Sequence, residues 1–238
     1  MLKRLRTDLR KFTSPQKAKI LSRFFKTGPG QYGEGDRFIG VTVPQSRAVA
    51  KKYKDLSFEE LTTLLHSPVH EERLVALLIL IEQFKSAGRR SDEKTREKIY
   101  RFYLANTKYI NNWDLVDLSA EKIIGPYLED KSKEVLKKLA KSKSIWERRI
   151  AILSTFHYIK HGDYKWTLEI AEMLLKDDHD LIHKAVGWML REVGKTCGEK
   201  ILTNFLDKHA ATMSRTMLRY SIEKFPEGKR QKYLTRTS

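Results

Sequence analysis

Hydrophobic residues recur along this chain at the three- and four-residue spacing of an α-helix, and no alternating strand pattern persists beyond residues 38–43. Ser14-Pro15 predicts a helix through Phe25, because serine caps a helix start and proline is favoured in the first turn. Residues 57–60 form a capping box ahead of a leucine-rich stretch. Helices are further expected to start or stop at Pro44, Pro68, Pro126 and Pro226.

A two-helix pattern recurs along the sequence. Each copy has a first helix, a short polar turn and a second helix with small residues where helices pack closely, and the second helices carry segments 71–77, 146–152 and 182–187. Helix pairs with a period of about 35–40 residues are typical of HEAT-like repeats. We therefore predict an all-α fold, an α-solenoid. It forms a single domain over residues 1–238, with N-terminal helices in 1–56 and helical pairs in 57–225.

The charge of the chain narrows the class of partner. Lysine and arginine number 47 against 30 acidic residues, a formal net charge of +17, and the cations are spread along the chain. A net positive charge of this size, spread along the chain, indicates contact with a nucleic acid or an anionic membrane. The most apolar run, residues 74–81, is too short to span a bilayer. The single cysteine excludes a disulfide framework, and the basic N-terminus lacks the apolar region of a secretory signal. We expect a soluble, cytoplasmic protein.

Residues 28–37 interrupt the helical pattern with four glycines. A nucleotide-binding loop is disfavoured here, because this segment follows a helix and no Gly-Lys-Ser/Thr sequence closes it. We expect a flexible connection or a loop that touches DNA.

The most informative residues are Trp113 and Asp117, which lie four positions apart and so share a helix face. Equivalent positions of successive second helices line one surface of a solenoid. On that basis Arg149, Lys184 and Trp188 are expected to converge with this pair on one groove. A carboxylate in a basic groove is best explained by a cation, or a developing cation, that it meets.

Cleavage of the N-glycosidic bond of a nucleotide suits these groups. A base alkylated at N3 or N7 is cationic and a good leaving group, and its departure leaves an oxocarbenium-like sugar that a carboxylate stabilises. The same carboxylate can position or deprotonate the attacking water. Tryptophan faces favour cations and sugar C–H groups, and Arg149 would hold a phosphate.

Simpler interpretations exist for each residue alone. A helical tryptophan is more often a core residue, which applies to Trp113 and Trp188. Asp117 could bond to a neighbouring helix N-terminus, and Arg148 and Arg149 could pair with Glu147 or solvent. The joint pattern across three repeats favours the functional interpretation.

The histidines form three pairs with the i,i+4 spacing of metal ligands: His66/His70, His157/His161 and His179/His183. None belongs to a His-Glu-x-x-His motif, and no third ligand follows at a motif distance. The sequence therefore predicts no metal site. Motifs of nucleophilic catalysis are also absent.

Three segments, 112–117 (Asn-Trp-Asp-Leu-Val-Asp), 145–153 and 184–192, resemble the AlkD-type DNA alkylation repair glycosylases. The likeness extends from the helices of 14–53 to about residue 225. It implies a HEAT-like solenoid that holds duplex DNA in a basic groove and excises N3- and N7-alkylated purines without metal or cofactor. The sequence departs from the family pattern in the loop 28–37, which is longer, and at Phe24, where a tyrosine is expected.

The resemblance implies residue roles. Asp117 resembles the catalytic carboxylate, Trp113 and Trp188 the aromatic pair that cradles the sugar–phosphate, and Arg149 the phosphate clamp. The further positions predicted to contact DNA are Phe24, Arg47, Arg148, Lys184, Arg191 and Lys195.

The sequence thus predicts a monomeric DNA glycosylase for 3-methyladenine, 7-methylguanine and similar cationic purines, acting in base excision repair. It would associate with the nucleoid when bound to DNA, and it would need no membrane or obligate protein partner. The alternative is a non-catalytic HEAT-repeat protein that binds bent, branched or damaged DNA. A protein-interaction scaffold would explain the repeats but not the charge of +17.

Overall fold

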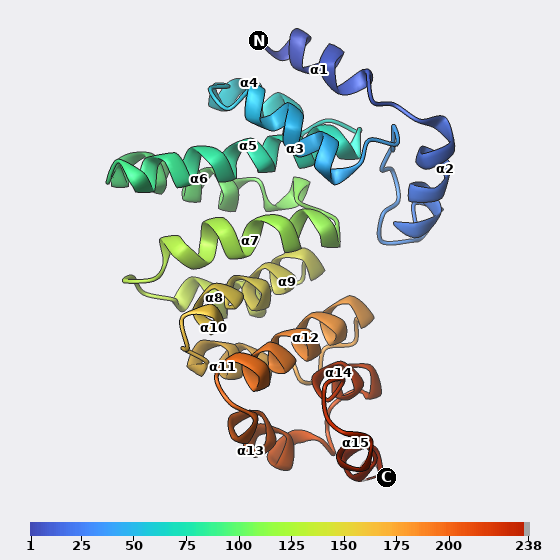
Figure 1. Cartoon of the computed structure of the whole chain (residues 1–238), viewed down its shortest axis with the longest axis vertical. Helices are drawn as coiled ribbons and strands as arrows, with labels where there is room; N and C mark the ends of the chain where they lie inside the picture. Colours follow the sequence, from blue (N-terminus) through green and yellow to red (C-terminus); the bar gives the residue numbers. More distant parts are fainter. Residues whose placement is uncertain (236–238) are drawn as a thin grey trace. The chain divides into compact units, whose positions relative to one another are not determined.

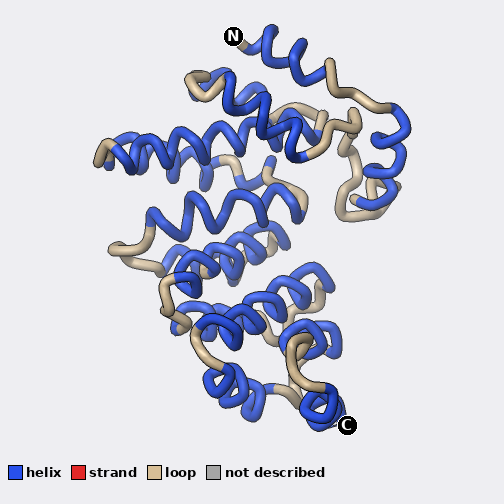
Figure 2. Tube along the Cα trace, in the orientation of Figure 1, coloured by secondary structure: helices blue, strands red, loops and turns tan. Residues whose placement is uncertain are grey.

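The computed structural model describes residues 1–235, and over this range the regular structure is helical, apart from one isolated bridge between Arg37 and Val69. Figure 2 shows helices joined mostly by short loops, with a long loop between the second and third helices. The prediction of an all-α chain is confirmed. The chain divides into two compact units, Met1–Ser119 and Ala120–Ser238, with the boundary inside helix α7.

The first unit contains the helices coloured from blue to green in Figure 1. In chain order they are α1 (Leu2–Arg10), α2 (Pro15–Phe24), α3 (Val43–Lys52), α4 (Phe58–Leu65), α5 (His70–Arg89), α6 (Glu93–Ala105), the 3-10 helix η1 (Thr107–Tyr109) and the start of α7 (Trp113–Tyr127).

Helix α5 is the core of the first unit. Its apolar run, residues 74–81, is buried throughout, and α3, α4 and α6 all pack against it. Burial on every face explains why this stretch is hydrophobic all round rather than amphipathic. The guanidinium of Arg6 on α1 forms a bidentate ion pair with Glu72 on α5, with a shortest N–O distance of 2.8 Å.

The long loop between α2 and α3 is anchored to α5 by Glu71. The buried carboxylate of Glu71 accepts hydrogen bonds from the backbone N–H groups of Ile39, Gly40 and Val41, at 2.8–3.2 Å. Gly40 has a φ of 82° and lies so close to the Ser14 carbonyl that a Cβ would stand 2.1 Å from it. Only glycine fits there, because both the backbone conformation and the space exclude a side chain.

The second unit begins with the rest of α7 and continues to the C-terminal part of the described chain (Figure 1). Its further helices are α8 (Glu134–Ala140), α9 (Ile145–Ser154), α10 (Phe156–Lys160), α11 (Lys165–Met173), α12 (Asp180–Thr196), α13 (Glu199–His209), α14 (Arg215–Ser221) and α15 (Glu227–Thr235). Helix α12 is central, because α9, α11, α13 and α14 pack against it.

The predicted helical pairs are confirmed as α4/α5, α8/α9 and α11/α12, each joined by a short turn and packed together. The predicted helix starts are also confirmed. Ser14 caps α2 by accepting from the Lys17 amide, and Ser57 and Glu60 form the capping box of α4. No helix of the described residues is long and apolar enough to cross a membrane.

Candidate active site

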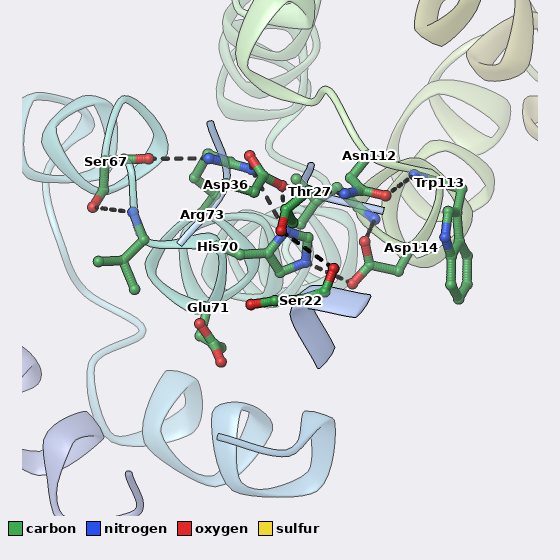
Figure 3. A network of polar contacts seen from close by, with 12 residues as sticks. Ser22, Thr27, Asp36, Ser67, His70, Glu71, Arg73, Asn112, Trp113 and Asp114 are labelled. Carbon is green, nitrogen blue, oxygen red and sulfur yellow. Dashed lines mark hydrogen bonds and ion pairs between the residues drawn. The ribbon is translucent and has the colours of Figure 1, made fainter. Parts of the chain in front are cut away.

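The start of α7 is held by a buried asparagine. Asn112 is fully buried, and its side-chain oxygen accepts a hydrogen bond from the backbone N–H of Trp113 at 2.8 Å. Its amide nitrogen donates to Asp36 Oδ2 at 3.1 Å. Asp36 belongs to the glycine-rich loop, so this contact ties the loop to the residue that presents Trp113 (Figure 3).

Four charged side chains form a buried network beside Asn112. His70 Nδ1 lies 3.0 Å from Asp36 Oδ2, and His70 Nε2 lies 2.8 Å from Asp114 Oδ2. Arg73 contacts Asp36 Oδ1 at 2.6 Å (Figure 3). All four side chains are at least nine-tenths buried. Two carboxylates face two cationic groups, which is the condition under which buried charges are tolerated.

The network sets the charge of its histidine. Burial lowers the pKa of His70, but the adjacent Asp114 carboxylate, together with Asp36, outweighs burial and raises this pKa to about 9. For Asp36, burial raises the pKa, but the hydrogen bond to His70 and the Arg73 guanidinium lower it below its ordinary value. His70 is therefore a cation at neutral pH and Asp36 an anion.

Aromatic rings support Trp113. The ring of Phe25 lies nearly parallel to it, with 5.0 Å between centroids and 15° between planes. Phe24 meets it edge-on at 5.8 Å. Phe25 also stacks on Phe38, which in turn stacks on His70. Trp113 is only half-buried, so the cluster fixes the indole and leaves part of it accessible.

Asp117 lies one turn after Trp113 on α7, as predicted, and it is half-buried. The negative charge of Asp117 acts on the Tyr103 phenol. Burial raises the pKa of Tyr103, and the Asp117 carboxylate raises it further. The phenol donates to Ser119 Oγ at 2.8 Å, because that hydroxyl already donates to the Leu115 carbonyl.

A cleft of about 310 Å³ opens beside the aromatic cluster in the first unit. Its wall is mainly apolar, with Phe24, Phe25 and Phe38 along it, and its polar residues include Lys17, His70 and Asp114. Phe24 is 62% exposed, which is unusual for so large an apolar side chain. Arg47, on α3, is also exposed.

In the second unit, the two arginines of α9 that are predicted to contact DNA both bond to other parts of the protein. Arg149 is only 5% exposed, and its guanidinium donates to the Leu181 carbonyl at the start of α12. Arg148 forms an ion pair with Asp177 at 2.6 Å and donates to the carbonyls of Ser142 and Lys143. Arg148 therefore supports the turns before α9 and α12, and a contact with DNA would require it to exchange these partners.

Trp188 is half-buried on α12, beside Phe156 at 5.8 Å between ring centroids. Its indole N–H donates to Glu192 at 3.2 Å. The other predicted DNA contacts of α12 are partly exposed: Lys184 pairs with Asp180, Arg191 with Glu192 and Glu223, and Lys195 with Glu192.

The structure thus places Trp113 and Asp117 one turn apart on α7, with Phe24 against the Trp113 ring, in the first unit. It places Arg149, Lys184 and Trp188 on α9 and α12 of the second unit. Arg149 and the start of α12 are in contact, as expected for successive second helices. That all of these residues face one groove stays a prediction.

Sequence reasoning missed the buried network. In the sequence, Asp36 is one residue of the glycine-rich loop 28–37, and His70 is one member of the pair His66/His70 with the spacing of metal ligands. Asp114 is one residue of the segment 112–117. The signal available is local: polar residues at both ends of the apolar α5 and α7 stretches imply partners inside the fold. Nothing in the spacing says which residues those partners are.

Two comparisons bear on identity. The family model of the DNA alkylation repair enzymes matches residues 5–225, nearly the whole chain. The chain belongs to this family. Its fold is shared with a solved structure described as a predicted DNA alkylation repair enzyme from Enterococcus faecalis, at 16% identity and a TM-score of 0.66 over 90% of this chain and 97% of that one. No curated protein matches the chain.

Family membership confirms the predicted resemblance to DNA alkylation repair enzymes, and the shared fold confirms the α-solenoid fold class. A role in the repair of alkylated DNA follows for this chain, with DNA as its partner.

Proposed function

We propose that the protein is a monofunctional DNA glycosylase that hydrolyses the N-glycosidic bond of N3- and N7-alkylated purines in duplex DNA. The observation that carries the proposal is the pair of Trp113 and Asp117 on α7, both partly accessible, in a member of the DNA alkylation repair enzyme family. A protein that only binds DNA has no need of a carboxylate beside an accessible indole, since a carboxylate repels phosphates.

The chemistry proposed for Asp117 is electrostatic. As the bond between C1′ and the base nitrogen breaks, its electron pair leaves with the cationic base, which becomes neutral, and positive charge develops on the sugar. The Asp117 carboxylate stabilises that charge. Water then adds to C1′ and passes its proton to the carboxylate or to solvent. The leaving base needs no protonation, so the proposal includes no metal and no cofactor.

Trp113 and Trp188 are proposed to contact the deoxyribose and its flanking phosphates, because an indole face attracts cationic groups and sugar C–H groups. The support given to Trp113 by Phe25 and Asn112 holds such a surface ready before DNA binds. Arg149 is proposed to clamp a phosphate, oriented by its bond to the Leu181 carbonyl.

The proposed DNA surface includes further residues of both units. These residues are Phe24, Arg47, Arg148, Lys184, Arg191 and Lys195. The protein is proposed to act as a monomer in the cytoplasm.

The test is single-turnover release of 3-methyladenine and 7-methylguanine from methylated duplex DNA. Wild type is expected to release both, and Asp117→Asn to lose about 100-fold or more of the rate while it keeps its DNA affinity, since one preorganised charge is removed. Asp55→Asn is the matched control, because it makes the same chemical change at an exposed position.

Equal rates for wild type and Asp117→Asn would remove Asp117 from the mechanism. No release by wild type, together with tight and salt-sensitive binding, would favour the alternative of a non-catalytic protein that binds bent, branched or damaged DNA.

A further inference from the structure

Two histidines and a glutamate meet in the second unit, apart from every residue assigned above. His157 lies on the short helix α10, and His161 is the residue that ends it. Their i,i+4 spacing puts both imidazoles on one side of the helix. Glu129 comes from the turn after α7. One nitrogen of each ring and one carboxylate oxygen all lie within 4.8 Å of one another.

These distances fit a tetrahedral metal ion. Zinc binds imidazole nitrogens and carboxylate oxygens at about 2.0–2.2 Å, which sets neighbouring ligand atoms roughly 3.3 Å apart. His157 Nε2 lies 3.1 Å from Glu129 Oε2. The His161 side chain is 58% exposed, and one nitrogen of its ring lies within 4.8 Å of the other two ligand atoms.

His157 provides a nitrogen that lacks a good partner. Its Nε2 is buried and makes no aligned hydrogen bond, although the Glu129 carboxylate is close. An imidazole binds a metal in its neutral form, through the ring nitrogen that carries no proton. A buried polar atom without a partner is uncommon and requires an explanation.

His161 is oriented in the way that metal-bound histidines usually are. Its Nδ1 lies 2.9 Å from the carbonyl oxygen of His157. When Nδ1 donates its proton to that carbonyl, Nε2 keeps the lone pair that binds a metal, and the ring is held in one tautomer.

The nearby lysines leave the cluster accessible to a cation. Lys160 pairs with Glu121, and Lys133 donates to the backbone carbonyl of Glu129 at 2.8 Å rather than to its carboxylate. The Glu129 side chain is 48% exposed. An entry path from solvent therefore exists on the carboxylate side.

We propose that Glu129, His157 and His161 form a binding site for a divalent transition-metal ion, best suited to Zn²⁺, with water as the fourth ligand. The bound ion would tie the turn after α7 to the end of α10 and so stabilise the second unit. The two other i,i+4 histidine pairs differ. Both nitrogens of His70 bond to carboxylates, and in the last pair His179 Nδ1 accepts from the Leu181 amide while His183 bonds to the Asp177 carbonyl.

The test is a titration of the tag-free, chelator-treated full chain with Co²⁺, followed by visible absorption, and with Zn²⁺, followed by calorimetry. We expect one equivalent of metal to bind, with the intense absorption of four-coordinate Co²⁺. His161→Gln and Glu129→Gln are each expected to weaken binding by about 100-fold or more, because loss of a ligand costs at least as much as loss of its supporting contact.

His209→Gln is the matched control, because His209 also faces a glutamate, Glu172, at 3.6 Å but has no second histidine beside it among the described residues. The metal affinity of His209→Gln should equal that of wild type. Zn²⁺ should also raise the unfolding temperature of wild type and of His209→Gln, but not of the two ligand variants. Absence of Co²⁺ absorption, or equal affinity in all four proteins, would overturn the site.

Discussion

At the scale of single residues, the unusual feature is a charged network inside the first unit. Asp36, His70, Arg73 and Asp114 exchange hydrogen bonds at 2.6–3.0 Å with almost no exposure to water. Removal of such charged groups from water costs free energy. Each group is tolerated in the interior because its ion-pair and hydrogen-bond partners offset that cost. The network ends at Asn112, which holds the backbone of Trp113. A buried structural feature thus supports the proposed site.

The stability of the fold should depend on the charge of His70. Because its pKa in the folded protein, about 9, lies above the ordinary value of 6.5, protonated His70 contributes stability that is fully present below pH 6.5 and is lost as the pH rises through 9. We expect wild type to lose roughly 3 kcal/mol more than His70→Gln between about pH 6 and about pH 10. Urea unfolding of both proteins at each pH measures this difference. Equal losses of unfolding free energy in the two proteins would mean that the pH dependence of stability does not come from His70.

At the scale of elements, close approach between helices depends on glycine. Gly187 lies in α12 where α14 packs against it, and a Cβ there would stand 2.5 Å from the Met217 carbonyl and from Tyr220 Cβ. These contacts are to backbone and to a Cβ, which cannot move aside as the end of a flexible side chain can. The repeat pattern of the sequence predicts small residues at such positions.

Gly187→Ala should therefore destabilise the protein by about 1–3 kcal/mol, because overpacking forces α12 and α14 apart. Gly88→Ala is the matched control: Gly88 lies in α5, and a Cβ added there would have nothing within 4 Å. That variant should be neutral or more stable by up to about 1 kcal/mol, since alanine favours a helix. Thermal or urea unfolding of both variants measures the effects. Similar behaviour of the two variants would show that α12 and α14 tolerate the extra methyl.

At the scale of the whole molecule, the formal net charge of +17 belongs to a member of the DNA alkylation repair enzyme family. Cations that neutralise phosphates release counterions, so DNA affinity should fall steeply with salt. This property comes from composition and is independent of the chemistry proposed for Asp117.

The logarithm of affinity for an undamaged duplex should fall linearly with the logarithm of salt concentration. Arg47→Ala should reduce the magnitude of the slope by about one, since each lost phosphate contact removes about one counterion. Lys208→Ala removes an exposed cation outside the predicted DNA surface and should leave the slope unchanged. Fluorescence anisotropy over a salt series measures all three proteins. An equal change in both variants would mean that Arg47 contacts no phosphate.

The amino-acid sequence by itself determined the helices, their paired repeats and their starts, because helical periodicity and caps such as Ser14 and Ser57 depend on residues within a few positions of one another. It also determined the family, because the motif around Trp113 and Asp117 is contiguous. Tertiary structure alone decided which distant residues meet. Asp36 reaches His70 and Asn112, and Glu129 joins the pair of His157 and His161, through packing of helices far apart in the chain. No local pattern encodes such contacts, because they depend on how the buried faces of different helices pack together.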